Sequence, residues 1–182
     1  MSDDALHPPV RPAPRKPTVR FLFSHPAHFI ALGFGSGLSP VAPGTVGTLW
    51  AWLVFLLLQP LLSPLRWGLV IVVALVVGWW ACTVAARHLA VADPGAIVWD
   101  EVVAFWIVLW LVMPASGWTQ LAAFALFRAF DAAKPGPVAW ADQLFKGKRN
   151  QPIGWRQGLG ILFDDLVAAL CALILIALWR WW

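Results

Sequence analysis

Two adjacent pairs of acidic residues stand within or beside strongly apolar stretches. Asp164 and Asp165 lie about two turns into the last apolar block, and Asp100 and Glu101 open an earlier one. A carboxylate at the centre of a membrane helix costs roughly 2.5–3.5 kcal/mol on insertion scales, so such residues usually face a partner or a functional site. Carboxylate oxygens suit Mg²⁺, which binds through a few carboxylates and the phosphate oxygens of its substrate. We predict a divalent-metal site at these four residues, with Asp93 as a further candidate ligand.

Charged residues recur at helix spacing in a second segment. Arg128, Asp131 and Lys134 stand three residues apart, so Arg128 and Asp131 share one helix face. A guanidinium binds a phosphoryl group through a bidentate fork, and an ammonium binds it as a point charge. We therefore predict catalytic roles for all three: Arg128 and Lys134 contact a phosphoryl group, and Asp131 binds metal or positions a water. The structural alternative is that the acids only form ion pairs with these cations.

A loop rich in glycine and proline, residues 33–48, precedes the first clear helix. Its composition excludes a regular helix, so we expect a re-entrant loop followed by a helix that Thr45 or Thr48 caps. Backbone N–H groups of such a loop, together with a helix N-terminus, can bind a phosphate. The predicted phosphate-binding residues are Gly33, Gly35, Gly44, Thr45, Arg128 and Lys134.

The elements that position these residues are predicted to be membrane helices. The chain has 182 residues, of which 60% are hydrophobic and 12% charged, with 14 Trp and no Tyr. A soluble domain is nearer half apolar and about a quarter charged, so a soluble globular enzyme and a disordered chain are excluded as first interpretations. We predict an all-α, polytopic membrane bundle of about four to five helices. The expected apolar segments are residues 45–58, 67–86, 102–113, 121–127 and 158–179.

The remaining segments are polar. Residues 1–20 are predicted to be a disordered, basic, proline-rich tail, and residues 21–182 a single membrane-embedded domain. Pro135 is expected to end a helix, because the residue before a proline avoids the α region. A polar loop is expected from 134 to 157. The histidines, His25, His28 and His88 among them, are too few and too scattered for a zinc site.

The distribution of cations predicts the orientation in the membrane. If residues 1–20 face the cytoplasm and five membrane helices follow, all 13 Lys and Arg residues fall on the cytoplasmic side except Arg66 and Arg180. That bias satisfies the positive-inside rule. With this topology the acidic pairs and the Gly/Pro loop also lie at the cytoplasmic face. We predict a multi-pass protein with its N-terminus and active site on that side; residues 102–127 are short enough to form a hairpin that does not cross fully.

Four stretches of the chain resemble the phosphatidylglycerophosphatase A family, and they occur in the family's order. They are GFGSGLSPVAPGTVGTLWA at 33–51, DPGAIVWDEVVAFW at 93–106, FRAFDAAKPGPVAWAD at 127–142 and GLGILFDDLVAA at 158–169. The resemblance implies a bacterial inner-membrane enzyme that hydrolyses phosphatidylglycerol phosphate to phosphatidylglycerol and inorganic phosphate with Mg²⁺. The family's acidic and basic positions would fall on Asp93, Asp100, Glu101, Asp131, Asp164, Asp165, Arg128 and Lys134.

Other functions remain open at this point. A cation transporter could use intramembrane carboxylates as ion ligands, although acids near mid-membrane or on both sides would then be expected. A structural scaffold would tolerate amides at the acidic positions. The DxxDGxxAR run of CDP-alcohol phosphotransferases and the SGH-like motif of histidine-nucleophile lipid phosphatases do not occur. We expect a lipid substrate and the lipid bilayer as partners and no nucleic acid; the sequence does not specify an oligomeric state.

Overall fold

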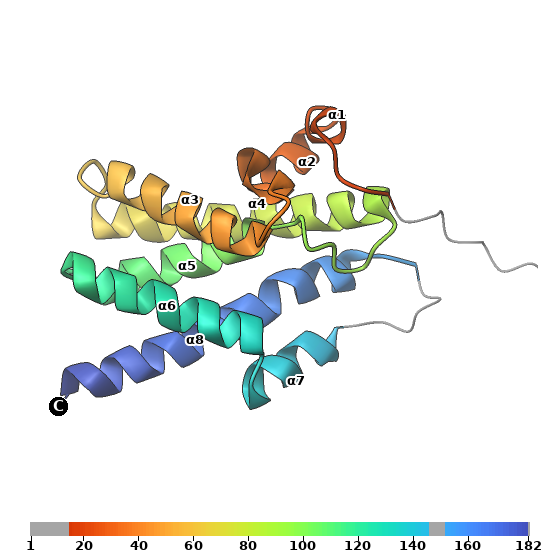
Figure 1. The fold of residues 1–182 in the computed structure, drawn as a ribbon. Helices are drawn as coiled ribbons and strands as arrows, with labels where there is room; N and C mark the ends of the chain where they lie inside the picture. Colours follow the sequence, from red (N-terminus) through yellow and green to blue (C-terminus); the bar gives the residue numbers. More distant parts are fainter. Residues whose placement is uncertain (1–14, 146–151, 182) are drawn as a thin grey trace, which may run out of the picture.

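The computed structural model describes residues 15–145 and 152–181, which are all-helical (Figure 1). This confirms the predicted fold class. Most of the predicted tail, residues 1–14, lies outside the described residues. The elements of the described part are α1 (Val19–Leu22), α2 (Pro26–Ala31), the 3-10 helix η1 (Gly33–Leu38), α3 (Pro43–Leu58), α4 (Pro64–Leu89), α5 (Trp99–Val112), α6 (Gly117–Ala133), α7 (Gly136–Leu144) and α8 (Trp155–Trp181).

The five long helices correspond to the five apolar segments expected from the sequence. The estimate of about four to five helices missed the short helices α1, α2, α7 and η1, because segments of one or two turns show no clear helical periodicity. α7 occupies part of the segment predicted to be a polar loop, so that prediction was wrong there. Pro135 does separate two helices: α6 ends at Ala133, and Lys134 takes a left-handed conformation with φ 43°.

The Gly/Pro segment is more helical than predicted. Pro43 occupies the first turn of α3 and Ala42 is its N-cap, so neither Thr45 nor Thr48 caps the helix. A proline suits a first turn because its missing N–H would have no helical partner there. Gly33, Phe34 and Gly35 all have positive φ, at 53°, 57° and 106°, which reverses the chain direction within η1. Re-entrant placement of this segment in a membrane stays a prediction.

Two described helices are long and apolar enough to span a membrane. α4 has 26 residues and a mean hydropathy of 2.5 in its most apolar window, and α8 has 27 residues and 2.6. About 20 apolar residues are needed to cross a hydrocarbon core of about 30 Å. α3, α5 and α6 are shorter, with 16, 14 and 17 residues. By length and composition, α4 and α8 are therefore the candidate membrane spans of the described residues.

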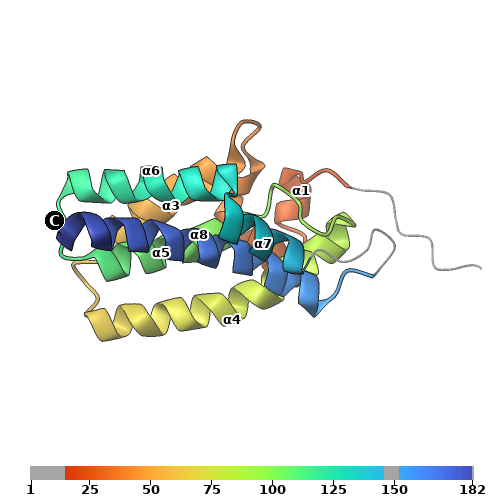
Figure 2. The same ribbon diagram turned by 90° about the horizontal axis from the view of Figure 1, so that it is seen from below.

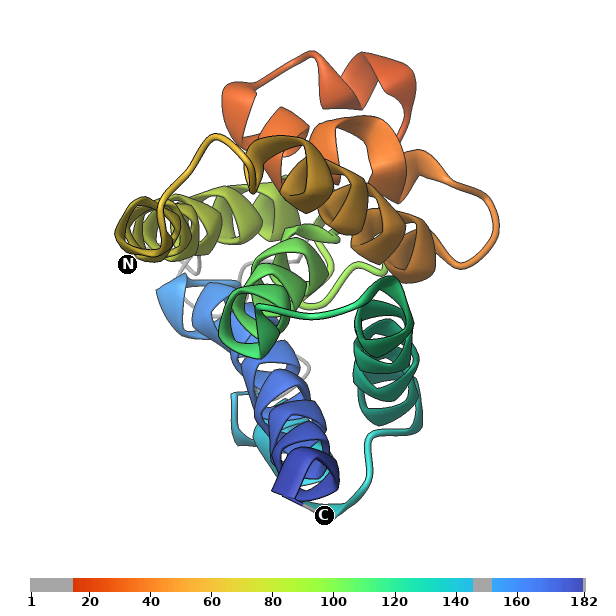
Figure 3. The same cartoon turned by 90° about the vertical axis from the view of Figure 1, so that its left-hand side faces the viewer.

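α5 is the central helix of the bundle. It contacts α3, α4, α6 and α8, which surround it when the molecule is viewed along the helices (Figure 3). Indole N–H groups join it to its neighbours: Trp99 donates to the Ala74 carbonyl at 3.0 Å and Trp106 to the Ala51 carbonyl at 2.9 Å. Figure 2 shows α7 lying across the first half of α8. The start of α5, the end of α6 and the first half of α8 therefore meet at one end of the bundle.

The histidines that seemed scattered in sequence gather where α2 meets α4. Nε2 of the buried His28 lies 2.7 Å from Nδ1 of His88, and its Nδ1 lies 2.9 Å from the Phe21 carbonyl oxygen. Burial lowers the pKa of His28; the hydrogen bond to Phe21 opposes this, and the neighbouring His88 and His25 lower the pKa further. Both ring nitrogens of His28 thus have partners within the protein.

Candidate active site

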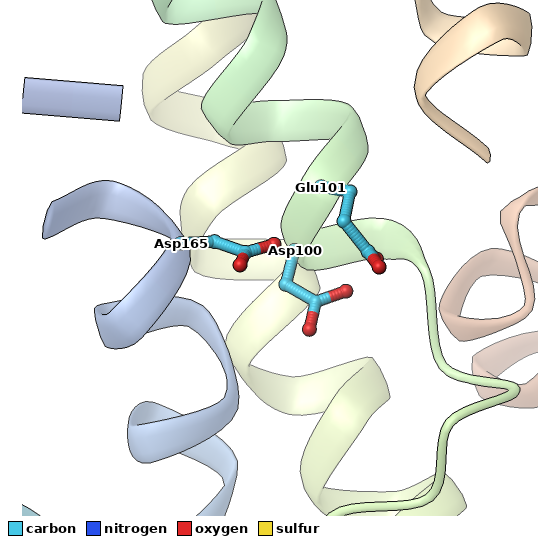
Figure 4. A group of neighbouring side chains, drawn as sticks. All are labelled: Asp100, Glu101 and Asp165. Carbon is cyan, nitrogen blue, oxygen red and sulfur yellow. The ribbon is translucent and has the colours of Figure 1, made fainter. Parts of the chain in front are cut away.

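Three carboxylates from two helices converge at one end of α5. One oxygen each from Asp100, Glu101 and Asp165 lies within 4.8 Å of the other two (Figure 4). Asp100 and Glu101 occupy the first turn of α5, where a negative charge interacts favourably with the helix dipole. Val98 is the N-cap of the helix, and its backbone N–H donates to the Ala31 carbonyl at 3.0 Å, which attaches the start of α5 to α2.

The carboxylate oxygens at this point have unused bonding capacity. Asp100 Oδ1, Glu101 Oε2 and Asp165 Oδ2 are buried, and none has a hydrogen-bond partner among the described residues. A buried acceptor without a partner costs roughly 1–3 kcal/mol, more for a charged group, so three at one place call for a ligand. Hard oxygen donors in such a group fit a divalent cation such as Mg²⁺. The two predicted acidic pairs therefore do not form one group of four ligands. Asp165 lies with Asp100 and Glu101, and Asp164 does not.

Arg128 connects α6 to the three carboxylates. Its Nη1 lies 2.6 Å from Asp131 Oδ2 and 3.7 Å from Glu101 Oε1. The shared face predicted for Arg128 and Asp131 is therefore confirmed, and part of the predicted ion pairing exists. A cation beside carboxylates that each keep one oxygen without a hydrogen-bond partner among the described residues is an arrangement that could bind a metal ion together with a phosphoryl group.

Lys134 and Asp164 form a second centre beside the first. The Lys134 ammonium donates to Asp142 Oδ1 at 2.8 Å and to Asp164 Oδ2. Partial burial lowers the pKa of Lys134, but the hydrogen bonds to Asp142 and Asp164 raise it well above its usual value, so the ammonium is charged at any physiological pH. Asp164 and Asp165 point to different centres because adjacent helical residues project about 100° apart.

A cavity opens next to this second centre. It is small, with about 20 Å³ of space for a water-sized molecule, and Asp93, Asp142, Asp164 and Gln157 are among its lining residues. Asp93 therefore lies on the Lys134 side, apart from the α5 carboxylates. Asp142 and Gln157 were not among the predicted site residues. Asp142 ends the family-like stretch at 127–142, but the sequence did not indicate its contact with Lys134, because α7, which carries it, was expected to be loop.

One of the predicted phosphate-binding residues of the Gly/Pro segment touches the charged centre. A Cβ at Gly44 would collide with Glu101 Oε1 and lie 3.1 Å from Arg128 Nη2. Gly33 packs against Ser36 and Val98, and Gly35 faces Leu22. Thr45 is half-buried in the first turn of α3. Phosphate binding by all four stays a prediction, and Gly44 has the closest relation to the cations.

Comparison with known proteins identifies the family of this chain. The sequence model of phosphatidylglycerophosphatase A matches residues 29–180. The chain belongs to the phosphatidylglycerophosphatase A family. It is 39% identical over 150 residues to a phosphatidylglycerophosphatase A of Escherichia coli (strain K12), covering 82% of this chain and 80% of that protein. It is 35% identical over 167 residues to the Haemophilus influenzae phosphatidylglycerophosphatase A, covering 91% and 96%.

A further relative carries a different name. A Bacteroides thetaiotaomicron protein named as a candidate phosphatidylinositol-3-phosphatase is 40% identical over 159 residues, covering 84% of this chain and 92% of that protein. No solved structure matches the chain. Membership of the phosphatidylglycerophosphatase A family confirms the prediction of a phosphatase enzyme, and it gives no support to the cation transporter.

Proposed function

We propose that this protein removes the terminal phosphate of phosphatidylglycerol phosphate in a Mg²⁺-dependent reaction, with phosphatidylglycerol and inorganic phosphate as products. The observation that carries the proposal is the group formed by Asp100, Glu101 and Asp165, which lies beside Arg128. Each of the three carboxylates has one buried oxygen without a hydrogen-bond partner among the described residues. Carboxylates without a metal would repel a phosphate, whereas a metal between them would attract one. The relatives named phosphatidylglycerophosphatase A agree with this substrate.

The residues that would hold Mg²⁺ are Asp100, Glu101 and Asp165. Asp131 lies next to them through its ion pair with Arg128 and is a candidate fourth ligand. When bound, the metal would neutralise phosphoryl charge and lower the pKa of a coordinated water. We assign Asp164 as the partner of Lys134 rather than as a ligand of Mg²⁺, because its carboxylate already accepts a hydrogen bond from that ammonium.

Arg128 and Lys134 would bind the phosphoryl oxygens from two sides. Arg128 has a guanidinium next to the carboxylate group, and Lys134 is held at the neighbouring centre by Asp142 and Asp164. Both cations are held by carboxylates on the protein, so they are in place before substrate arrives. Preorganised positive groups of this kind stabilise the charge that develops in phosphoryl transfer.

We also propose that the protein is a multi-pass protein of the bacterial inner membrane, with this end of the bundle at the cytoplasmic face. The two apolar helices α4 and α8 support membrane insertion. All the residues discussed above lie at the end of the bundle that the positive-inside rule assigns to the cytoplasm. A lipid substrate could then keep its acyl chains in the bilayer while its headgroup reaches the carboxylates.

The decisive experiment is phosphate release by the purified protein in detergent or lipid micelles, with and without Mg²⁺. We expect release from phosphatidylglycerol phosphate that a chelator abolishes and added Mg²⁺ restores. Asp165→Asn should abolish release without unfolding the protein. Asp4→Asn, in the predicted tail, is the matched carboxylate-to-amide control and should retain activity.

The substrate panel should include phosphatidylinositol 3-phosphate and phosphatidic acid, because one relative is named for the former. Preference for phosphatidylglycerol phosphate would support the proposal. A well-folded wild-type protein that releases no phosphate from it, but does so from the inositol lipid, would replace this substrate with the other.

A further inference from the structure

We propose that the 44–48 turn of α3 positions the Arg128 guanidinium for catalysis, with Thr48 as a positioning residue that the sequence analysis did not assign to the site. The inference rests on the proposed phosphatase function. It concerns a residue that would contact neither substrate nor metal and would act through Arg128.

Thr48 offers Arg128 a hydroxyl of fixed orientation. The residue is completely buried, and its hydroxyl donates to the Gly44 carbonyl at 2.8 Å. A threonine hydroxyl has one proton, so this bond leaves its lone pairs to accept from elsewhere. Arg128 Nη1 lies 3.5 Å from Thr48 Oγ1 and donates to it. The bond from the Thr48 hydroxyl to the Gly44 carbonyl thus keeps the hydroxyl oxygen oriented toward the guanidinium.

Gly44 supplies the space that the guanidinium occupies. Residues 44 and 48 are four apart and share one face of α3. An added Cβ at Gly44 would lie 3.1 Å from Nη2 and 3.2 Å from Nη1 of Arg128, and it would collide with Glu101. One turn of α3 therefore places Gly44, which has no side chain, and the Thr48 hydroxyl against the Arg128 guanidinium.

A neutral acceptor has a function here that a carboxylate could not have. Asp131 on α6 and Glu101 on α5 already draw the guanidinium in two directions. Thr48 approaches from a third helix and adds no negative charge, so it does not further offset the positive potential that the guanidinium presents to a phosphoryl group. Nε of Arg128 is buried with no hydrogen-bond partner among the described residues, so no bond at Nε fixes the orientation of the guanidinium plane. The Thr48 contact supplies that restraint.

Hydroxyl-free variants at position 48 test this inference. Thr48→Val keeps the shape of the side chain, and Thr48→Ala provides a second variant if the valine is not tolerated. We expect kcat for phosphatidylglycerol phosphate to fall about tenfold, the lower end for loss of a hydrogen bond to a charged group, with a smaller change in KM. Thr48→Ser should restore kcat to within about twofold of wild type, because the hydroxyl returns.

Thr83→Val is the matched control. Thr83 is also completely buried, and its hydroxyl donates to the carbonyl four residues earlier, Trp79, at 2.6 Å, but on α4. Its loss should leave kcat unchanged. The inference is overturned if Thr48→Val and Thr48→Ala keep wild-type kcat, if Thr48→Ser fails to rescue it, or if Thr83→Val loses as much. An inactive wild-type enzyme would instead refute the proposed function.

Discussion

Replacing Lys134 with methionine should destabilise the protein by removing the partner of two carboxylates. Methionine keeps most of the length of the side chain and loses its charge. Lys134 binds Asp142 on α7 and Asp164 on α8, so the substitution leaves two acceptors without their cation at the junction of three helices. Below the ordinary lysine pKa the raised pKa of Lys134 contributes its full stabilisation, so neutral pH is suitable for the measurement.

The expected size of the effect follows from the exposure of the three side chains. Removing one partner of a buried ion pair costs roughly 3–5 kcal/mol, whereas an exposed pair contributes less than about 1 kcal/mol. The Lys134 side chain is 32% exposed, and those of Asp142 and Asp164 are 12% and 9% exposed. Solvent therefore screens the cation more than the acids, and we expect a loss of about 2–3 kcal/mol.

The assay is reversible denaturant unfolding in detergent micelles with a chelator present, so that metal binding does not contribute. Lys16→Met, at an exposed position, is the control and should leave the free energy of unfolding unchanged. In the double variant Lys134→Met with Asp164→Asn, the buried carboxylate that lost its lysine partner is neutralised, and about 1 kcal/mol should return. A single variant as stable as wild type, or a double variant no more stable than the single one, would refute the reasoning.

Three further substitutions have expected outcomes. Asp165→Asn should reduce Mg²⁺-dependent phosphate release at least 100-fold while raising stability in chelator, because a buried charge is removed; isothermal titration with Mg²⁺ should show weakened binding, and undiminished binding would exclude it as a ligand. Gly44→Ala should displace the Glu101 carboxylate and lower kcat, with near-normal expression; wild-type turnover would contradict the close contact. Trp106→Phe removes the indole bond to Ala51 and some packing, so unfolding should become easier by roughly 1–3 kcal/mol with kcat little changed, as unfolding and activity assays would show.

Much of the architecture follows from the sequence, because it depends on local composition. The apolar blocks of the sequence correspond to α3, α4, α5, α6 and α8, of which α4 and α8 are long enough to span a membrane. Pro135 ends a helix through backbone sterics alone. Errors arose where local signals compete. Thr45 and Thr48 are good capping residues, yet α3 begins earlier. Pro43 occupies its first turn, a position that proline favours.

The acidic pairs and the cations were also identified from the sequence, since charge within apolar segments is costly and therefore informative. Their division into two centres was not. Asp164 and Asp165 are chemically identical neighbours, and only the packing of α8 between α5 and α7 brings Asp165 to Asp100 and Glu101 and Asp164 to Lys134.

Sequence alone thus determined the five long helices, the identity of the charged residues within them and the family, because each depends on short stretches of chain. Tertiary structure decided which partners those residues meet. Asp142 reaches Lys134 because a short helix follows the turn at Pro135, and Thr48 reaches Arg128 because α3 and α6 approach the same end of α5. Contacts between residues 80 positions apart depend on how helices pack, and no local pattern in the chain encodes that distance.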